Sequence, residues 1–194
     1  LQVRYQDVLE ADLSELTGRG RTVAVGNLPY QITSPLLEAL LTAQPPFAGI
    51  VVMVQREVGR RLAAQPGTRD YGALTLLARF YAGRPEVIAE LSPGSFHPPP
   101  RVHSVVLQVI PREPPIADAE GRERFFAVVR AAFGQRRKQL ANALSGAPTL
   151  GLDREGAIRA LSAAGIDPER RGETLSLEEF VALTTTVAAV GGAD

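Results

Sequence analysis

The sequence predicts an α/β sheet followed by a small all-helical region, and three observations support this fold class. Short apolar runs alternate with helical patterns over the first half of the 194-residue chain. The run at 50–54 is apolar at every position, as in strands that are covered on both faces of a parallel sheet. Beyond the proline-rich stretch at 111–115, every pattern is helical. We therefore expect two domains, residues 1–113 and residues 114–194.

The first two strands and the helix between them are predicted from local patterns. Residues 22–25 form a short β-branched run, and residues 50–54 form the second strand. Between them, Thr33-Ser34-Pro35 predicts a helix start, with a hydroxyl cap and a proline in the first turn. The apolar stripe that this helix turns to the core consists of Leu36, Leu37, Leu40 and Leu41.

The remainder of the first domain is predicted to end in an antiparallel pair of strands. Residues 58–64 and 74–81 have helical patterns, whereas residues 86–91 and 104–110 are strands with no helix between them. Strands that follow one another in this way favour an antiparallel pair within the sheet. The joining loop, residues 92–101, is rich in proline and glycine, and its length and stiffness suit a site loop.

The second domain is predicted from amphipathic stripes. Leu140 and Leu144 share one helix face, and residues 157–161 and 180–187 supply two further helices. Within Ser176-Leu177-Glu178-Glu179, the serine and the last glutamate have the spacing of a capping box. The longest stripe consists of Phe125, Phe126, Val129, Ala132 and Phe133.

Composition excludes several classes of site. The chain has no cysteine, which rules out disulfides, thiolate metal sites and a cysteine nucleophile. With only His97 and His103, a multi-histidine metal site is not expected. No apolar run approaches the length of a membrane span and no signal peptide is visible, so we expect a cytoplasmic protein. The net charge is zero, but residues 121–145 carry six basic side chains against one acidic one, a local charge of +5.

The motif Asn27-Leu28-Pro29-Tyr30 follows directly on the first strand, where ligands bind in open α/β sheets. The Asn27 side-chain oxygen and the Leu28 carbonyl are two acceptors that suit the two N–H bonds of an adenine amine. Pro29 stiffens the turn. Tyr30 offers a face on which a flipped-out base can stack, worth about 1–3 kcal/mol. The alternative is an ordinary Asn-x-Pro turn with a packed tyrosine beside it.

Six segments, in the same order along the chain, resemble the rRNA adenine dimethyltransferases, and the resemblance covers essentially the whole chain. The C-terminal segments favour the branch that modifies the small ribosomal subunit over the related antibiotic-resistance enzymes, which act on large-subunit RNA. The resemblance implies a Rossmann-like class I methyltransferase sheet followed by a small all-helical domain. The segments are VGNLPYQITSPLL at 25–37, MVQREVGRRL at 53–62, YGALTLL at 71–77, FHPPPRVHSVV at 96–106, FFAVVRAAFGQRRKQLANAL at 125–144 and GIDPERRGETLSLEEFVAL at 165–183.

The resemblance also implies an activity, which is dimethylation of the N6 amines of adenosines in small-subunit (16S) rRNA during ribosome biogenesis. The methyl donor would be S-adenosylmethionine, with Asp7 and Asn27 as its binding residues. For Asp7 the alternative is a turn cap, and for Phe96 it is an ordinary loop-anchoring side chain. The implied catalytic residues are Asn27, Leu28, Pro29, Tyr30 and Phe96, the last packing against the target base.

The implied partner is small-subunit rRNA or the immature small ribosomal subunit. Arg136, Arg137 and Lys138, at an expected helix start, would form a phosphate-binding patch with salt-dependent affinity. The alternative is a solvated helix face. Arg101, a further expected RNA contact, stands where the family usually has lysine, and His103 stands where it often has aspartate. We expect a monomer, with no metal and no membrane contact.

The start of the chain bears on the cofactor. Residues 1–4 look like the middle of a strand, and the chain starts with Leu1, not methionine. The family's glycine-rich cofactor loop, and the acidic residue that holds the ribose hydroxyls, have no counterpart in the sequence. We therefore expect a sheet that is incomplete at its N-terminus and a further segment before Leu1 in the natural protein. The alternative is a true fragment that binds S-adenosylmethionine weakly or not at all.

Two other functions compete with the enzyme. One is a non-catalytic RNA-binding or ribosome-assembly factor that kept the fold, which is the stronger alternative for this chain taken alone. A pure binder would not need the paired acceptors of Asn27 and Leu28. The other is a DNA adenine methyltransferase, whose motif is similar. The helical region with its basic cluster favours RNA over DNA.

Overall fold

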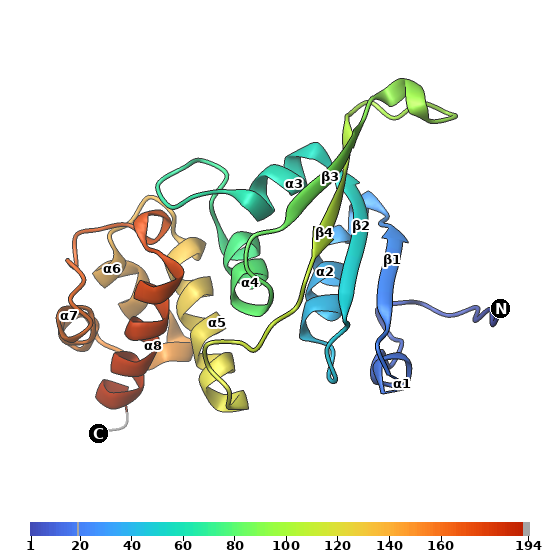
Figure 1. Ribbon diagram of the computed structural model, residues 1–194. Coiled ribbons are helices and arrows are strands. Elements are labelled where there is room, and N and C mark those ends of the chain that lie inside the picture. The colour runs from blue at the N-terminus through green and yellow to red at the C-terminus, as the bar shows by residue number, and fades with distance from the viewer. Residues whose placement is uncertain (19, 192–194) are drawn as a thin grey trace. The chain divides into compact units, whose positions relative to one another are not determined.

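A four-stranded mixed sheet organises the first half of the chain (Figure 1). Its strands are β1 (Val23–Asn27), β2 (Gly49–Gln55), β3 (Glu86–Leu91) and β4 (Ser104–Val109), in the order β1-β2-β4-β3. β1 and β2 are parallel, and both β2 and β3 pair antiparallel with β4. The expected α/β sheet ending in an antiparallel pair is confirmed. β1 extends two residues beyond the predicted run, so Asn27 is the last residue of the strand.

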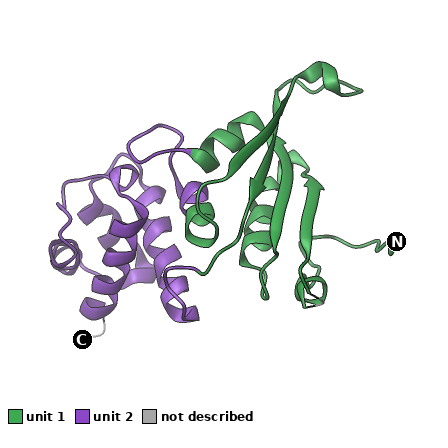
Figure 2. Ribbon diagram, viewed as in Figure 1, with its two compact units in different colours: residues 1–63, 77–113 green, residues 64–76, 114–194 purple. Residues whose placement is uncertain are grey.

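The computed structural model describes residues 1–18 and 20–191. These fall into two units, shown in Figure 2: unit 1 comprises residues 1–63 and 77–113, and unit 2 comprises residues 64–76 and 114–194. The sequence-based division at residue 113 coincides with one boundary between the units. It does not anticipate that residues 64–76 group with the helical unit.

The helices that precede or cover the sheet are short. They are α1 (Ser14–Thr17), the 3₁₀ turn η1 (Tyr30–Ile32), α2 (Thr33–Thr42), α3 (Arg56–Ala63), α4 (Ala73–Tyr81) and the 3₁₀ turn η2 (Pro93–Ser95). The predicted leucine stripe of α2 is confirmed, since all four leucines are buried. The core of the sheet is apolar, with Ile50, Val52, Val54 and Leu107 at most 1% exposed.

The predicted hydroxyl cap of α2 is wrong. The residue before the helix is Ile32, which makes no side-chain capping bond. Because η1 runs directly into α2, Thr33 already has helical angles. Its hydroxyl therefore faces back along the chain and donates to the carbonyl of Pro29 at 2.9 Å, a common pattern for threonine in a helix.

The predicted strand at residues 1–4 is also wrong. The described N-terminal segment has no ladder partner, and Figure 1 shows it leading away from β1. Leu1, Val3 and Tyr5 are fully or largely exposed. A period-two pattern alone does not form a strand, because the backbone groups need a neighbouring strand to bond. On β1, Val25 is 78% exposed, so this edge of the sheet is apolar and uncovered in the described residues.

Unit 2 contains the predicted helices. They are α5 (Ala119–Gly134), α6 (Leu140–Ser145), the 3₁₀ turn η3 (Pro148–Leu150), α7 (Arg154–Ala163), the 3₁₀ turn η4 (Gly172–Thr174) and α8 (Leu177–Gly191). The core contains Phe125 and Phe180, both fully buried, with their rings edge to face at 6.5 Å. The described residues contain no helix long and apolar enough to cross a membrane.

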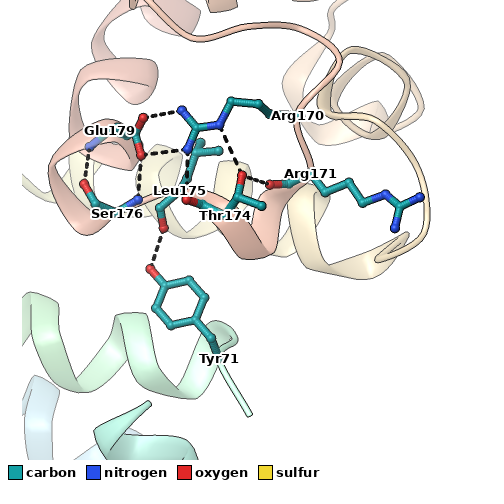
Figure 3. Close-up of polar contacts among 7 residues, drawn as sticks. All are labelled: Tyr71, Arg170, Arg171, Thr174, Leu175, Ser176 and Glu179. Carbon is teal, nitrogen blue, oxygen red and sulfur yellow. Dashed lines mark hydrogen bonds and ion pairs between the residues drawn. The ribbon is translucent and has the colours of Figure 1, made fainter. Parts of the chain in front are cut away.

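Figure 3 shows the polar network that begins α8. The predicted capping box is confirmed, because the Ser176 N–H donates to Glu179 Oε2 at 2.8 Å and the Glu179 N–H donates to Ser176 Oγ at 3.2 Å. Arg170 pairs with the same carboxylate through two guanidinium nitrogens. It also donates to the backbone carbonyl of Thr174 at 2.8 Å, so one side chain fixes both the loop and the helix start.

Candidate functional site

A pocket of about 380 Å³ lies at the carboxyl ends of β1 and β2 in unit 1. Asn27 and Met53 are register partners at the ends of these two parallel strands. This is the position at which open α/β sheets bind ligands, and the volume is in the usual range for small-molecule sites. The lining residues are Asn27, Leu28, Pro29, Tyr30, Met53, Phe96, His97, Pro98 and Pro100.

The turn at residues 27–30 is anchored to the sheet and to α2. The Leu28 N–H donates to the Met53 carbonyl at 3.1 Å, which continues the parallel ladder by one bond beyond β1. The Pro29 carbonyl accepts from Thr33, as described above, and from the Ile32 N–H at 3.2 Å. The Leu28 side chain is buried, at 5% exposure. The turn is therefore held at both ends by residues that belong to regular structure.

Two acceptors in this turn are left unused. The Leu28 carbonyl accepts no hydrogen bond among the described residues, and the Asn27 side chain makes none either. Asn27 itself is exposed. Because the Pro29 carbonyl is occupied, the Asn27 amide oxygen and the Leu28 carbonyl are the acceptors that the turn offers to a ligand.

The Phe96 loop supplies the other wall of the pocket. This loop, residues 92–103, extends beyond the end of the sheet (Figure 1). It contains η2, and the Phe96 N–H closes that turn by donating to the Pro93 carbonyl at 3.2 Å. Phe96 is half-buried and lines the pocket together with Tyr30. The structure thus brings the residue 27–30 motif and Phe96 to one cavity, although they are far apart in sequence.

Asp7 does not line this pocket. Its carboxylate is exposed, and Oδ1 accepts from the Leu9 N–H at 2.9 Å, which is the turn-capping geometry that competes with a cofactor role. Oδ2 makes no hydrogen bond among the described residues.

Arg101 directly follows Pro100, the last residue along the chain that lines the pocket. It is exposed and is not part of the lining. The end of this loop is fixed by a backbone bond, in which the Arg56 N–H donates to the His103 carbonyl at 2.9 Å. The His103 side chain is exposed. The described residues contain no cluster of histidine, aspartate and glutamate that could hold a metal ion.

The basic cluster at 136–138 lies in the turn between α5 and α6, and the expected helix start at these residues is wrong. Arg136 makes its contacts inside unit 2. Its guanidinium donates to the carbonyls of Arg69 at 2.7 Å and Tyr71 at 3.0 Å, and it lies 3.5 Å from the carboxylate of Glu173. Arg137 and Lys138 are exposed, and neither forms an ion pair or hydrogen bond with its side chain in the described part of the chain.

Sequence reasoning missed several residues of the pocket. Met53 was assigned only to a buried strand, although its register with Asn27 places it at the same edge. His97 was weighed only as a metal ligand. Ser104, which contacts a lining residue but does not line the pocket itself, was assigned only to a strand; it is fully buried, and its Oγ lies 3.1 Å from the Tyr30 hydroxyl. A hydroxyl residue at the start of an otherwise apolar strand was the one signal available.

Two curated relatives show the similarity at the sequence level. The ribosomal RNA small subunit methyltransferase A of Moorella thermoacetica is 44% identical over 190 residues, which cover 93% of this chain and 65% of that protein. The protein of the same name from Geobacter metallireducens is 44% identical over 197 residues, covering 99% of this chain and 70% of that protein. The chain spans slightly less than two thirds of the length of the Moorella relative.

Two solved structures share the fold. A dimethyladenosine transferase from Plasmodium falciparum has a TM-score of 0.83 and 22% identity, covering 98% of this chain and 73% of that chain. The 23S rRNA methyltransferase ErmE has a TM-score of 0.62 and 22% identity, covering 94% and 70%. Both likenesses establish the expected class I methyltransferase fold with a helical part. The family model described as ribosomal RNA adenine dimethylase matches residues 1–188, and the chain belongs to that family.

Proposed function

We propose that the natural protein transfers methyl groups from S-adenosylmethionine to the N6 amines of adenosines in small-subunit (16S) rRNA, twice for each target. The observation that carries this proposal is the single pocket that combines two free acceptors, on Asn27 and Leu28, with the aromatic rings of Tyr30 and Phe96. An exocyclic amine with two N–H bonds needs two acceptors, and an unstacked base needs aromatic surface.

The chain's residues act mainly by positioning. In the first transfer, the Asn27 oxygen and the Leu28 carbonyl accept from the two N–H bonds and favour a pyramidal nitrogen, whose lone pair is then available for attack; in the second transfer one N–H bond remains to be held. The base lies between the faces of Tyr30 and Phe96, so that the amine points at the strand ends. When bound, S-adenosylmethionine supplies an electrophilic methyl group on a sulfonium that leaves as a neutral thioether. The proton released from N6 passes to water, and no strong general base is required.

The described residues fit the reacting end of the cofactor. Amide and carbonyl oxygens beside aromatic faces suit a cationic sulfonium. We propose that Asn27 borders this end and that Asp7, whose Oδ2 is free among the described residues, accepts from the adenine amine of the cofactor. The test is a titration that compares the natural protein with its Asp7→Ala variant, with a fall in S-adenosylmethionine affinity expected and unchanged affinity counting against the role.

RNA recognition is assigned to exposed cations. We propose that Arg137 and Lys138 in unit 2, and Arg101 beside the pocket, contact phosphates of small-subunit rRNA or of the immature subunit. Arg136, predicted as part of the same patch, is proposed to support it by holding residues 69–71. We propose residues 1–113 as the methyltransferase domain and residues 114–194 as the helical domain, which supplies RNA contacts. The proposed setting is a cytoplasmic monomer.

The decisive experiment uses unmethylated small-subunit particles and isotopically labelled S-adenosylmethionine. The natural protein is incubated with both, the rRNA is digested to nucleosides, and N6,N6-dimethyladenosine is measured by mass spectrometry. Labelled dimethyladenosine is the expected product. Tight, salt-sensitive binding of the particles without any product would instead indicate the non-catalytic assembly factor. Methylation of adenine in DNA but not in rRNA would indicate the third alternative.

A further inference from the structure

Ser104 is fully buried, and its side chain contacts that of Tyr30 in the residue 27–30 motif. Its Oγ lies 3.1 Å from the hydroxyl of Tyr30, 74 residues earlier in the chain. We propose that Ser104 is a positioning residue for the adenine site: its hydroxyl tethers the tip of Tyr30 and so fixes the ring plane on which the target base stacks. This inference rests on the proposed function, because it assigns Tyr30 the role of base platform.

The anchor is rigid on the Ser104 side. Ser104 is the first residue of β4, and it is paired in register with Gln55 of β2 and Leu91 of β3. The preceding peptide group is also held, since the His103 carbonyl accepts from the Arg56 N–H. A hydroxyl on a strand that is bonded on both sides has little freedom to move, which is what a reference point for another side chain requires.

The Tyr30 side needs such an anchor. Tyr30 is 37% exposed and begins the 3₁₀ turn η1, outside the sheet. Tyr30 is one of the residues that line the pocket. In the proposed arrangement, the hydrogen bond at the ring tip sets the orientation of the ring. A displacement of about 1 Å in a positioning group can cost about 100-fold in rate, so the tether has consequences for catalysis beyond its own bond energy.

A purely structural explanation is available for comparison. Ser104 could simply be a small side chain where the ends of β2, β3 and β4 meet, in which case alanine would serve equally well. The hydrogen bond separates the two explanations. A space-filling residue acts independently of the Tyr30 hydroxyl, whereas a tether loses its effect once that hydroxyl is removed.

The test is a double-mutant cycle in the natural protein with Ser104→Ala, Tyr30→Phe and the double variant, assayed by dimethyladenosine formation on small-subunit particles. Each single variant should lower kcat about fivefold, the scale of one ordinary hydrogen bond, with KM for the particles unchanged. The double variant should be no slower than Tyr30→Phe alone. Thr184→Val, which removes the buried hydroxyl that donates to Phe180 in α8, is the matched control and should leave kcat unchanged.

A second readout follows the base itself. The wild type should quench the fluorescence of an RNA that carries 2-aminopurine at the target position, because stacking on an aromatic ring quenches the fluorescence of that base. The quenching should weaken in Ser104→Ala at equal RNA occupancy. If the double variant loses kcat by the product of the two single losses, the tether is refuted. The same holds if Ser104→Ala quenches the fluorescence of the probe as fully as the wild type does. If the wild type makes no dimethyladenosine, the proposed function is refuted, and the platform role of Tyr30 with it. This outcome can be told from failure of the tether alone, because it is seen in the wild type before any substitution is made.

Discussion

The hydroxyl of Tyr71 donates a 2.7 Å hydrogen bond to the backbone carbonyl of Leu175, 104 residues later in the chain (Figure 3). Both residues are fully buried. Nearby, the Gly67 N–H donates to the Glu173 carbonyl at 2.6 Å, and the Tyr71 and Phe133 rings meet edge to face at 6.0 Å. These contacts explain why residues 64–76 belong to unit 2, although they lie within the predicted methyltransferase domain.

Tyr71→Phe should destabilise unit 2 by about 1–3 kcal/mol, because the buried Leu175 carbonyl would lose its donor without gaining water. Urea unfolding followed by circular dichroism measures the change. Tyr5→Phe is the matched control, since Tyr5 is fully exposed and should tolerate the same change without effect. Equal stabilities of the two variants would contradict a structural role for the Tyr71 hydroxyl.

Arg136 and Arg137 are adjacent but should respond differently to alanine. Arg136→Ala removes a charged donor from two backbone carbonyls and should destabilise unit 2 by about 1–3 kcal/mol. Arg137→Ala should leave unfolding unchanged, weaken RNA binding, and reduce the slope of log affinity against log salt by about one. Thermal unfolding and filter binding at several salt concentrations separate them. The same salt slope in wild type and Arg137→Ala would remove Arg137 from the proposed RNA contact.

Glu179 should make the stability of unit 2 depend on pH. The hydrogen bond from Arg170 holds the pKa of Glu179 below its ordinary value, although partial burial opposes this shift. A carboxyl whose pKa is lower in the folded state contributes stability above its unfolded pKa, and that contribution is lost as the pH falls through the folded pKa.

Glu179→Gln should therefore be less stable than wild type near neutral pH, by about 1 kcal/mol or less for a partly exposed pair. The difference should begin to shrink as the pH falls below the ordinary glutamate pKa of about 4.3, because the unfolded chain takes up the proton before the folded carboxyl does. Melting temperatures over this pH range test the sign. Ser176→Ala is the comparison, because it removes a cap whose contribution of about 1 kcal/mol does not involve a titrating side chain. If the stability difference between wild type and Glu179→Gln grows on acidification, the expected direction of the pH dependence is wrong.

Gly59 is a buried residue of α3 that packs against β4 without room for a side chain. A Cβ at this position would lie 2.6 Å from Val105 Cγ2, so in Gly59→Ala the Val105 side chain, α3 or β4 must shift. Overpacking of this kind should cost about 1–3 kcal/mol in the unfolding of unit 1. Gly134→Ala, at the end of α5, meets nothing within 4 Å and should be neutral or stabilising by up to about 1 kcal/mol. Denaturant unfolding of both variants measures the two changes in the free energy of unfolding. Equal changes in the two variants would contradict the close packing at Gly59.

Asn27→Ala should abolish most turnover in the natural protein, with a fall in kcat of about 100-fold, the usual scale for losing one positioned polar group. RNA affinity should stay within about twofold, because the proposed phosphate contacts lie elsewhere. Asn142→Ala in α6 of unit 2 makes the same chemical change at an asparagine that bonds Arg154, and should retain turnover. Proportional loss of turnover and RNA binding in Asn27→Ala would count against the acceptor role.

Local sequence determined most of the regular structure. Alternation and helical periodicity act over a few residues, so the four strands of the sheet, the leucine stripe of α2, the helices of unit 2 and the Ser176–Glu179 capping box follow from local sequence, whereas the predicted strand at residues 1–4 does not form. The acceptor chemistry of the residue 27–30 motif was also visible, because it depends on residue type and on the position after a strand.

Only the tertiary structure decided which partners the polar side chains take. Arg136 bonds two carbonyls some 65 residues away, and Ser104 meets Tyr30 across 74 residues. The residue 1–4 pattern forms no strand, because a ladder needs a neighbour that local sequence does not specify. A short segment defines its own backbone preference, but a hydrogen bond between distant residues depends on how whole elements pack.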